Sequence, residues 1–176
     1  QLYEDLLNEF GPDLPRWGAE IKPDLTFRFN KTDLMFAKGE SFLNEDFKTI
    51  LADFFPRYVS IITAPKYRDD ILEVRIEGHT SSAWLGAETE ADAYIFNMTL
   101  SQARTRTTLA YLLNLSEVEQ DRIWLRKYLT ANGLSSAKVI VDEDGNEDPE
   151  RSRRVEFKVR TDAEGKIATI LEDTQL

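Results

Sequence analysis

The chain has 176 residues, 41% of them apolar and 31% charged, which is typical of a single domain with a sizeable core. Its net charge of −10 argues against a nucleic-acid binder, because such proteins neutralise phosphates with clustered Lys and Arg. The absence of cysteine excludes disulfides and thiolate metal sites, and the single histidine, His79, excludes a His-rich metal centre. We therefore expect no metal and no cofactor.

The first third of the chain predicts a helix, a linker, a strand and a long helix. Apolar residues recur at helical spacing over residues 2–10, and residues 11–23 hold three prolines, which favours a linker or strap. Alternation over residues 25–30 predicts a half-buried strand. Spacings of three and four over residues 41–62 predict a buried helical stripe, which Pro56 must bend or split.

The rest of the chain adds strands and a second helical region, reached through a long polar connection over residues 79–98. The expected strands are 71–77, 137–141, 153–160 and 167–171, and the expected helices run from about 100 to 115 and on to 132, where Gly133 would act as the stop. The order strand, helix, strand, helix, strand, strand predicts an α+β fold in which a mixed sheet carries the helices on one face. We expect these side chains to be deeply buried: Leu43, Phe47, Ile50, Leu51, Phe54, Val74, Ile76, Phe157 and Val159.

Arg104 is the most informative charged residue. Thr99 and Gln102 stand in the capping-box relation, which predicts a helix start with Arg104 in or just past the first turn. A cation at that place opposes the helix dipole by roughly 0.3–1 kcal/mol. Two explanations remain open: Arg104 clamps a carboxylate ligand, or it forms an internal salt bridge.

Two other segments could carry chemistry. The Gly78–Ser82 turn follows a strand, where small hydroxyl residues can line a ligand crevice, and His79 within it is either a general base or a structural residue. The acidic run over residues 142–148 does not have the spacing of a calcium loop, so we expect a solvated connection between strands.

Four segments together resemble the C-terminal domain of the OmpA/MotB family. They are GHTSS at 78–82, YIFNMTLSQARTRTTLAYL at 94–112, SRRVEFKV at 152–159 and, at the expected opening of the domain, DLMFAKGESFL at 33–43. The family has a strand ending in Gly-His-Thr-Asp, an Asn followed by Leu-Ser-x-x-Arg, and a final Arg-Arg-Val strand. The resemblance implies an OmpA-like βαβαββ domain over residues 25–161.

Domains of this family bind the peptide stem of peptidoglycan in the periplasm and do no chemistry, which the resemblance implies for this chain. In the family, the motif arginine grips a carboxylate of the diaminopimelate unit, and that arginine falls on Arg104. The family's aspartate falls on Ser81, which carries no charge, so either Glu88, Glu90 or Asp92 replaces it or the ligand differs. The implied binding residues are Arg104, Asn97, Ser81, Thr80, Tyr94 and Leu100.

Within the family, the GHTSS variant and the leading YEDLLNEF helix are most similar to the MotB-like stator subunits of Zorya anti-phage defence systems. That similarity implies a homodimer, a MotA-like channel partner, and an inner-membrane anchor preceding a helix and linker over residues 1–24. Residues 162–176 would form a C-terminal strand or tail. The apolar stripe of residues 2–10 would support the dimer if one domain leaves it uncovered.

The alternatives are a flagellar-type or outer-membrane OmpA-family anchor, a hydrolase using His79 with Ser81 or a loop carboxylate, and a pure dimerisation module in which the Arg104 site is vestigial.

Overall fold

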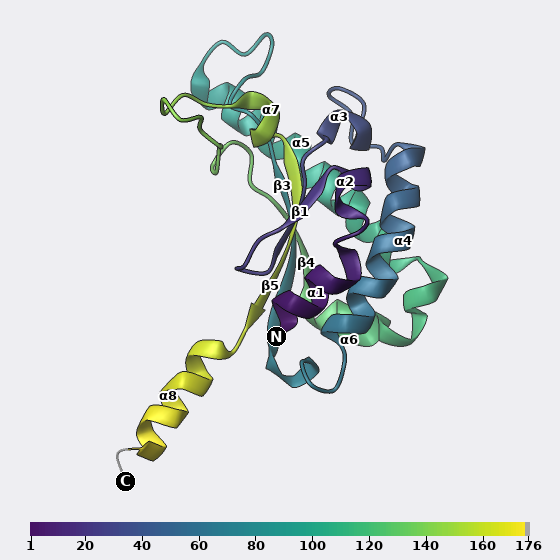
Figure 1. Cartoon of the computed structure of the whole chain (residues 1–176). Helices are drawn as coiled ribbons and strands as arrows, with labels where there is room; N and C mark the ends of the chain where they lie inside the picture. Colours follow the sequence, from purple (N-terminus) through teal and green to yellow (C-terminus); the bar gives the residue numbers. More distant parts are fainter. Residues whose placement is uncertain (175–176) are drawn as a thin grey trace.

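A five-stranded mixed sheet forms the centre of the molecule and carries its main helices on one face (Figure 1). The computed structural model of the protein describes residues 1–174, apart from the side chains of residues 164, 165 and 167–169. The spatial order of the strands is β1 (Ala19–Ile21), β2 (Thr26–Phe29), β5 (Arg154–Thr161), β3 (Ile71–His79) and β4 (Leu129–Gly133). The pair β3–β4 is parallel and the other pairs are antiparallel.

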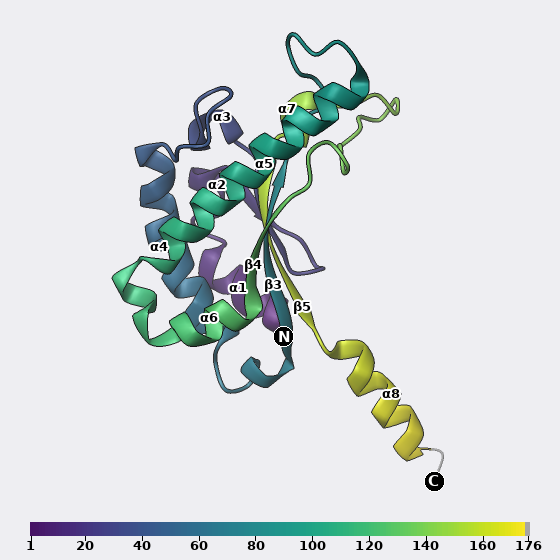
Figure 2. The same ribbon diagram turned by 180° about the vertical axis from the view of Figure 1, so that it is seen from behind.

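The helices α1, α4 and α6 and the C-terminal part of α5 lie on the same side of the sheet, whereas α8 projects away from the domain (Figures 1 and 2). The helices are α1 (Leu2–Phe10), α2 (Leu14–Trp17), α3 (Thr32–Met35), α4 (Glu45–Ile62), α5 (Glu90–Leu113), α6 (Arg122–Tyr128), α7 (Pro149–Ser152) and α8 (Ala163–Thr174). The order β2–α4–β3–α5–β4–β5 confirms the predicted α+β fold, with β1 as an additional edge strand. No described helix is long and apolar enough to cross a membrane.

Aromatic rings fill the space between the sheet and α4. Phe54 lies at their centre, with its ring centroid 4.5 Å from that of Phe27 and 5.1 Å from that of Phe157. The alternation in β2 and β5 directs Phe27, Phe29 and Phe157 toward the helices, as predicted. Of the side chains expected in the core, all are buried except Ile50, which is partly buried.

The N-terminal segment belongs to the same packed domain. The helix over residues 2–10 is confirmed, but its stripe of Leu2, Leu6 and Phe10 is buried in the domain's own core, which removes our argument from this stripe for a dimer. The expected linker over residues 11–23 is instead α2 and β1, with Trp17 buried. Apolar contacts of this kind stabilise short elements that proline-rich sequence alone does not predict.

Of the two effects predicted for Pro56, a split does not occur, because α4 runs through this residue. Other predicted features of the remaining chain were wrong. The helix α5 begins at Glu90 rather than near residue 100, because Thr89 accepts a hydrogen bond from the amide of Asp92 at 3.1 Å and so caps the helix. The alternation over residues 71–77 predicts Leu72 on the same face as Val74 and Ile76. Leu72 is instead exposed, because the β3–β5 pairing shifts register between Ile71 and Glu73.

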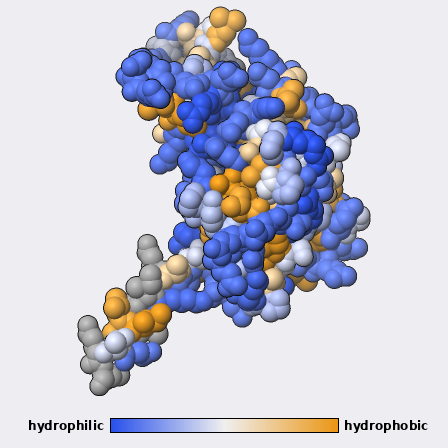
Figure 3. Space-filling model, viewed as in Figure 1, coloured by the Kyte–Doolittle hydropathy of each residue, from blue (hydrophilic) through white to orange (hydrophobic). Residues whose placement is uncertain are grey.

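The third strand of the predicted order lies at 129–133, not at 137–141. Residues 129–133 pair in parallel with β3, so neither a helix nor its stop occurs there, and residue 133 ends a strand. Val141 makes only an isolated bridge with Glu147. The segment 167–171 is part of α8, not a strand, since a five-residue apolar run fits either period. Figure 3 shows apolar surface on this projecting helix, where Ile170 and Leu171 are exposed.

Candidate functional site

A pocket of about 580 Å³ lies where the turn after β3, the segment around α3 and the middle of α5 meet. It brings together segments that are far apart in the chain. Its lining residues are Thr32, Asp33, Phe36, Lys38, Gly39, Thr80, Ser81, Ala83, Trp84, Leu85, Asn97, Leu100, Arg104 and Arg153.

Two glycines place α5 directly against the sheet below this pocket. Gly78 of β3 and Gly133 of β4 are partners across the parallel pair. A Cβ atom on Gly133 would lie 2.3 Å from the backbone nitrogen of Gln102, and one on Gly78 would lie 2.8 Å from the side chain of Thr105. Only glycine permits this close approach. The two glycines therefore determine the distance between α5, which carries Arg104, and the sheet.

Arg104 is held at the pocket by backbone carbonyls, not by an acid. Its Nε donates to the carbonyl oxygen of Glu40 at 2.8 Å, and Nη2 donates to that of Ala37 at 3.3 Å. The guanidinium carbon also lies 4.8 Å from the centroid of the Phe36 ring. No acid among the described residues forms an ion pair with Arg104, so the internal salt bridge that we considered is not present in this part of the chain.

The charge of Arg104 is poorly compensated. The residue is only 8% exposed, which is less accessible than we expected. Burial is the main cause that lowers the pKa of Arg104; Asp33 raises the pKa in part, Arg153 lowers it, and the result is a pKa of about 10. The helix-dipole explanation was wrong, because Arg104 lies well inside α5 and not in its first turn. A desolvated cation without a paired carboxylate nevertheless favours an anionic ligand.

Five of the six predicted binding residues line this pocket: Arg104, Asn97, Ser81, Thr80 and Leu100. Asn97 also stabilises the turn, since its Nδ2 donates to the carbonyl oxygen of Ala83 at 3.2 Å. Tyr94 does not line the pocket; its carbonyl oxygen instead accepts a hydrogen bond from the hydroxyl of Ser135 at 2.7 Å.

Sequence reasoning missed several side chains that line the pocket, among them Asp33, Lys38, Trp84 and Arg153. Arg153 could have been found because it is the first residue of the Arg-Arg-Val motif, and Asp33 and Lys38 because they lie in the motif at 33–43. Trp84 carried no comparable signal. The three acids of which one was considered as a replacement for the family aspartate, Glu88, Glu90 and Asp92, do not line the pocket.

The acidic run over residues 142–148 contacts the turn from outside. Both carboxylate oxygens of Glu147 accept hydrogen bonds from Ser82, one from its amide at 2.8 Å and one from its hydroxyl. Within the run, Asp142 accepts from the amides of Asp144 and Asn146. The run is therefore a folded connection attached to the turn after β3, and most of its residues are exposed.

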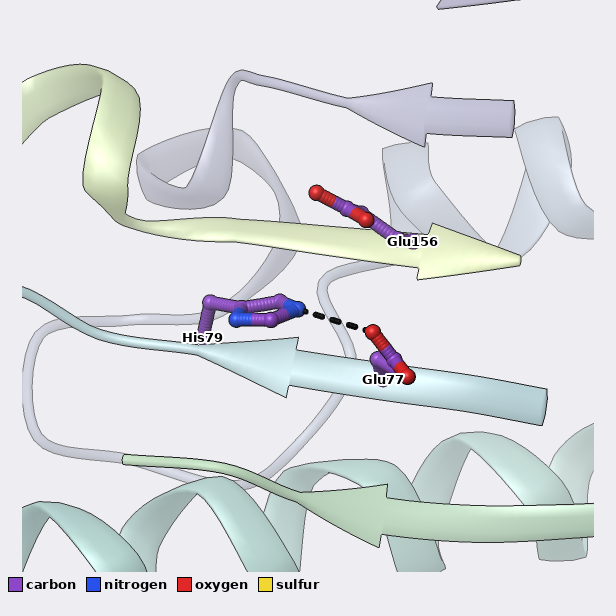
Figure 4. Close-up of side chains that lie close together, drawn as sticks. All are labelled: Glu77, His79 and Glu156. Carbon is purple, nitrogen blue, oxygen red and sulfur yellow. Dashed lines mark hydrogen bonds and ion pairs between the residues drawn. The ribbon is translucent and has the colours of Figure 1, made fainter. Parts of the chain in front are cut away.

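His79 lies outside the pocket, on the sheet face opposite the helices. Its Nε2 is 3.2 Å from a carboxylate oxygen of Glu77, and Glu156 lies on the neighbouring strand (Figure 4). Burial lowers the pKa of His79, which keeps the ring neutral at pH 7. No hydrogen bond joins His79 to Ser81 among the described residues, so the pairing required by the hydrolase alternative is not formed there.

Glu77, His79 and Glu156 offer three ligand atoms within 4.8 Å of one another, but cations already neutralise the two carboxylates. Glu156 pairs with Arg28 and Arg154, and Glu77 pairs with Arg75 and Lys158. Burial raises the pKa of Glu77, but the hydrogen bond from His79 and the charge of Lys158 outweigh it, and the pKa falls to about 2. Four cations around two carboxylates oppose a further cation, so the cluster is suited to structural pairing and not to metal binding.

Comparisons with known proteins identify the family and the fold. No family model matches the chain. The chain is 45% identical over 174 residues to the Zorya protein ZorB of Escherichia coli, an alignment that covers 98% of this chain and 73% of that protein.

Solved structures share the fold at low sequence identity. A MotB-like protein from Desulfovibrio vulgaris has a TM-score of 0.62 at 22% identity and covers 92% of both chains. The periplasmic domain of Helicobacter pylori MotB has a TM-score of 0.55 at 16% identity, covering 89% of this chain and 90% of that one. The cell wall anchor of the T6SS from Pseudomonas aeruginosa has a TM-score of 0.54 at 18% identity, covering 89% and 96%. The fold is therefore that of MotB-like domains, and the extensive identity to ZorB shows that the chain belongs to the ZorB family.

Proposed function

We propose that this domain binds peptidoglycan without cleaving it and anchors a membrane stator complex that acts in anti-phage defence. The observation that supports this most directly is Arg104, a buried cation that lines a pocket and has no acidic partner among the described residues. A buried, desolvated charge costs free energy unless an opposite charge, here a ligand carboxylate, compensates it. In the proposal, that carboxylate belongs to the peptide stem.

The other pocket residues have matching roles in the proposal. Thr80 and Ser81 provide the polar wall formed by the turn after β3, and Leu100 provides an apolar contact. Asn97 acts as a positioning residue, because it is bonded to the turn. Tyr94 has no role at this pocket.

The absence of catalysis is part of the proposal and has a physical basis. His79 is the only imidazole of the chain, and it is buried on the other face of the sheet from α5. A general base must come within hydrogen-bond reach of its proton donor, and Ser81 donates no such bond to His79.

Membership of the ZorB family and the MotB-like fold support a proposal for the assembly around the domain. We propose a periplasmic location, attachment to the inner membrane through a segment outside this chain, a MotA-like channel subunit as partner, and a homodimer. The described residues contain no membrane-spanning helix, so these assignments are tested on the longer protein. Light scattering measures whether the protein is a homodimer, and co-purification measures whether it binds the channel subunit.

The central experiment is a pull-down with purified peptidoglycan sacculi. We expect the wild-type domain to sediment with sacculi and Arg104→Met to remain soluble, because Met keeps the apolar stem against Phe36 but cannot bind a carboxylate. Arg104→Lys should bind only partly, since an ammonium cannot form two parallel bonds. Arg106→Met is the matched control, because Arg106 is exposed on the same helix and does not line the pocket.

Two results would contradict the proposal. Equal sedimentation of Arg104→Met and wild type would remove the role of the pocket. Release of soluble fragments from sacculi by the wild type, measured by chromatography, would replace the anchor with an enzyme.

A further inference from the structure

The pocket contains one acidic side chain, and it comes from an unexpected part of the chain. Ser81 has no charge to offer to a ligand ammonium. Among the pocket's lining residues the charged groups are Asp33, Lys38, Arg104 and Arg153. The site is therefore net positive, with a single carboxylate inside it.

Asp33 is available for a ligand. It lies in the short helix α3, its side chain is exposed, and it makes no ion pair or side-chain hydrogen bond among the described residues. Its charge acts on Arg104, because it is the nearby group that raises the pKa of that guanidinium. The carboxylate and the guanidinium thus share one site without being bonded to each other.

A second observation also points to a ligand at this edge of the pocket. Thr32, next to Asp33, lines the pocket and is only 5% exposed, yet its hydroxyl has no hydrogen-bond partner. A buried hydroxyl without a partner is uncommon in folded proteins, because it loses the hydrogen bonds that water would make. A polar ligand atom bound beside α3 could form the hydrogen bond that the Thr32 hydroxyl lacks.

The lining of the pocket also includes a second arginine. Arg153 is partly buried, has no ion pair among the described residues, and lines a smaller neighbouring pocket together with Thr32 and Asp33. Arg153 and Arg104 are close enough for their charges to repel, since Arg153 lowers the pKa of Arg104. A ligand carboxylate bound to both arginines would relieve that repulsion.

We propose that Asp33 receives the ammonium group of a zwitterionic amino-acid unit whose carboxylate lies on Arg104 and Arg153. Asp33 thus does from α3 what an acid in the position of Ser81 would do from the turn after β3. This inference rests on the proposed peptidoglycan-binding function and specifies its ligand chemistry: an amino acid with both charges, not a dicarboxylate alone.

The test compares two probes that differ in their ammonium groups, free meso-2,6-diaminopimelate and pimelate, by isothermal titration. Asp33→Asn should weaken binding of the diaminopimelate by about tenfold, which corresponds to the loss of one charge-assisted hydrogen bond. The affinity of Asp33→Asn for pimelate should be unchanged or higher, because the substitution removes only the repulsion between the Asp33 carboxylate and the carboxylates of pimelate. Glu88→Gln is the matched control: it removes one exposed acid that does not line the pocket, and both affinities should stay within about twofold of wild type.

A second variant tests whether position matters. Ser81→Asp, introduced together with Asp33→Asn, returns a carboxylate to the pocket from the turn after β3 and should restore part of the lost affinity for the diaminopimelate. Failure to restore it, with an unchanged melting temperature, would mean that charge at this pocket does not select the ligand, which overturns the inference.

The inference can fail separately from the function. If sacculi retain the wild type and Asp33→Asn but not Arg104→Met, and Asp33→Asn binds both probes as the wild type does, the anchor function stands and the role of Asp33 is wrong. An equal loss for both probes in Asp33→Asn also overturns it. If sacculi do not retain the wild type, the proposed function fails and this inference fails with it.

Discussion

Replacing Gly133 by alanine tests whether close packing of α5 on the sheet controls the candidate site. The added Cβ would lie 2.3 Å from the backbone nitrogen of Gln102 and 2.6 Å from its Cα. Ordinary carbon contacts need about 3.5 Å, so α5 must move outward by roughly 1 Å. Overpacking of this kind costs about 1–3 kcal/mol. The smaller entropy of the unfolded alanine chain offsets about 0.4–1 kcal/mol of that.

We therefore expect Gly133→Ala to lower the free energy of unfolding by about 1–2 kcal/mol, or the melting temperature by roughly 2–8 °C. Because the helix that moves carries Arg104, retention by sacculi should also fall. Thermal and urea unfolding measure the first effect, and the pull-down measures the second.

Thr130→Ala is the control for this change, since Thr130 is exposed on the same strand and should cost less than about 1 kcal/mol. Unchanged stability together with unchanged binding in Gly133→Ala would refute the reasoning, because a backbone contact this close cannot absorb a methyl group without moving.

Three further predictions concern stability. Phe54→Ala should lower the free energy of unfolding by about 3–5 kcal/mol in urea, since its ring is fully buried, whereas Phe42→Ala, 74% exposed, should cost less than about 0.5 kcal/mol; similar costs would contradict the assigned core. The pKa of Glu77 in the folded protein is about 2, below its ordinary value of 4.5, so Glu77 contributes stability above pH 4.5 that is lost as the pH falls toward 2. Melts from pH 2 to 6 should be flatter for Glu77→Gln, and parallel curves would refute this. Glu147→Gln should speed amide exchange across residues 142–148, measured by mass spectrometry, with a global change below about 1 kcal/mol; unchanged exchange would show that the bonds to Ser82 do not hold this run.

Local sequence patterns predicted the elements in which apolar residues recur along one face. Strict alternation in β5 and the i, i+3, i+4 spacing of α4 describe faces that can be buried in only one way, and both were confirmed. Arg104 was selected from the sequence although the reason given was wrong. Its importance comes from burial without an acid, not from a position at a helix start.

The start of α5 could have been recognised from the chain. Thr89 followed by Asp92 is a capping pattern of the same kind as the one that we assigned at Thr99, and the structure uses the earlier one. Two similar local signals compete there, and the packing of the longer helix decides between them.

The amino-acid sequence by itself determined the order of strands and helices and selected the arginine at the pocket, because these depend on side-chain periodicity and on local motifs. That Gly78 and Gly133 are the glycines on which α5 packs was decided by the tertiary structure. Only the tertiary structure decided that 129–133 is a strand, since its pairing with β3 comes from a segment more than fifty residues earlier. It also decided that Asp33 shares a pocket with Arg104, as no local pattern records a contact between segments so far apart in the chain.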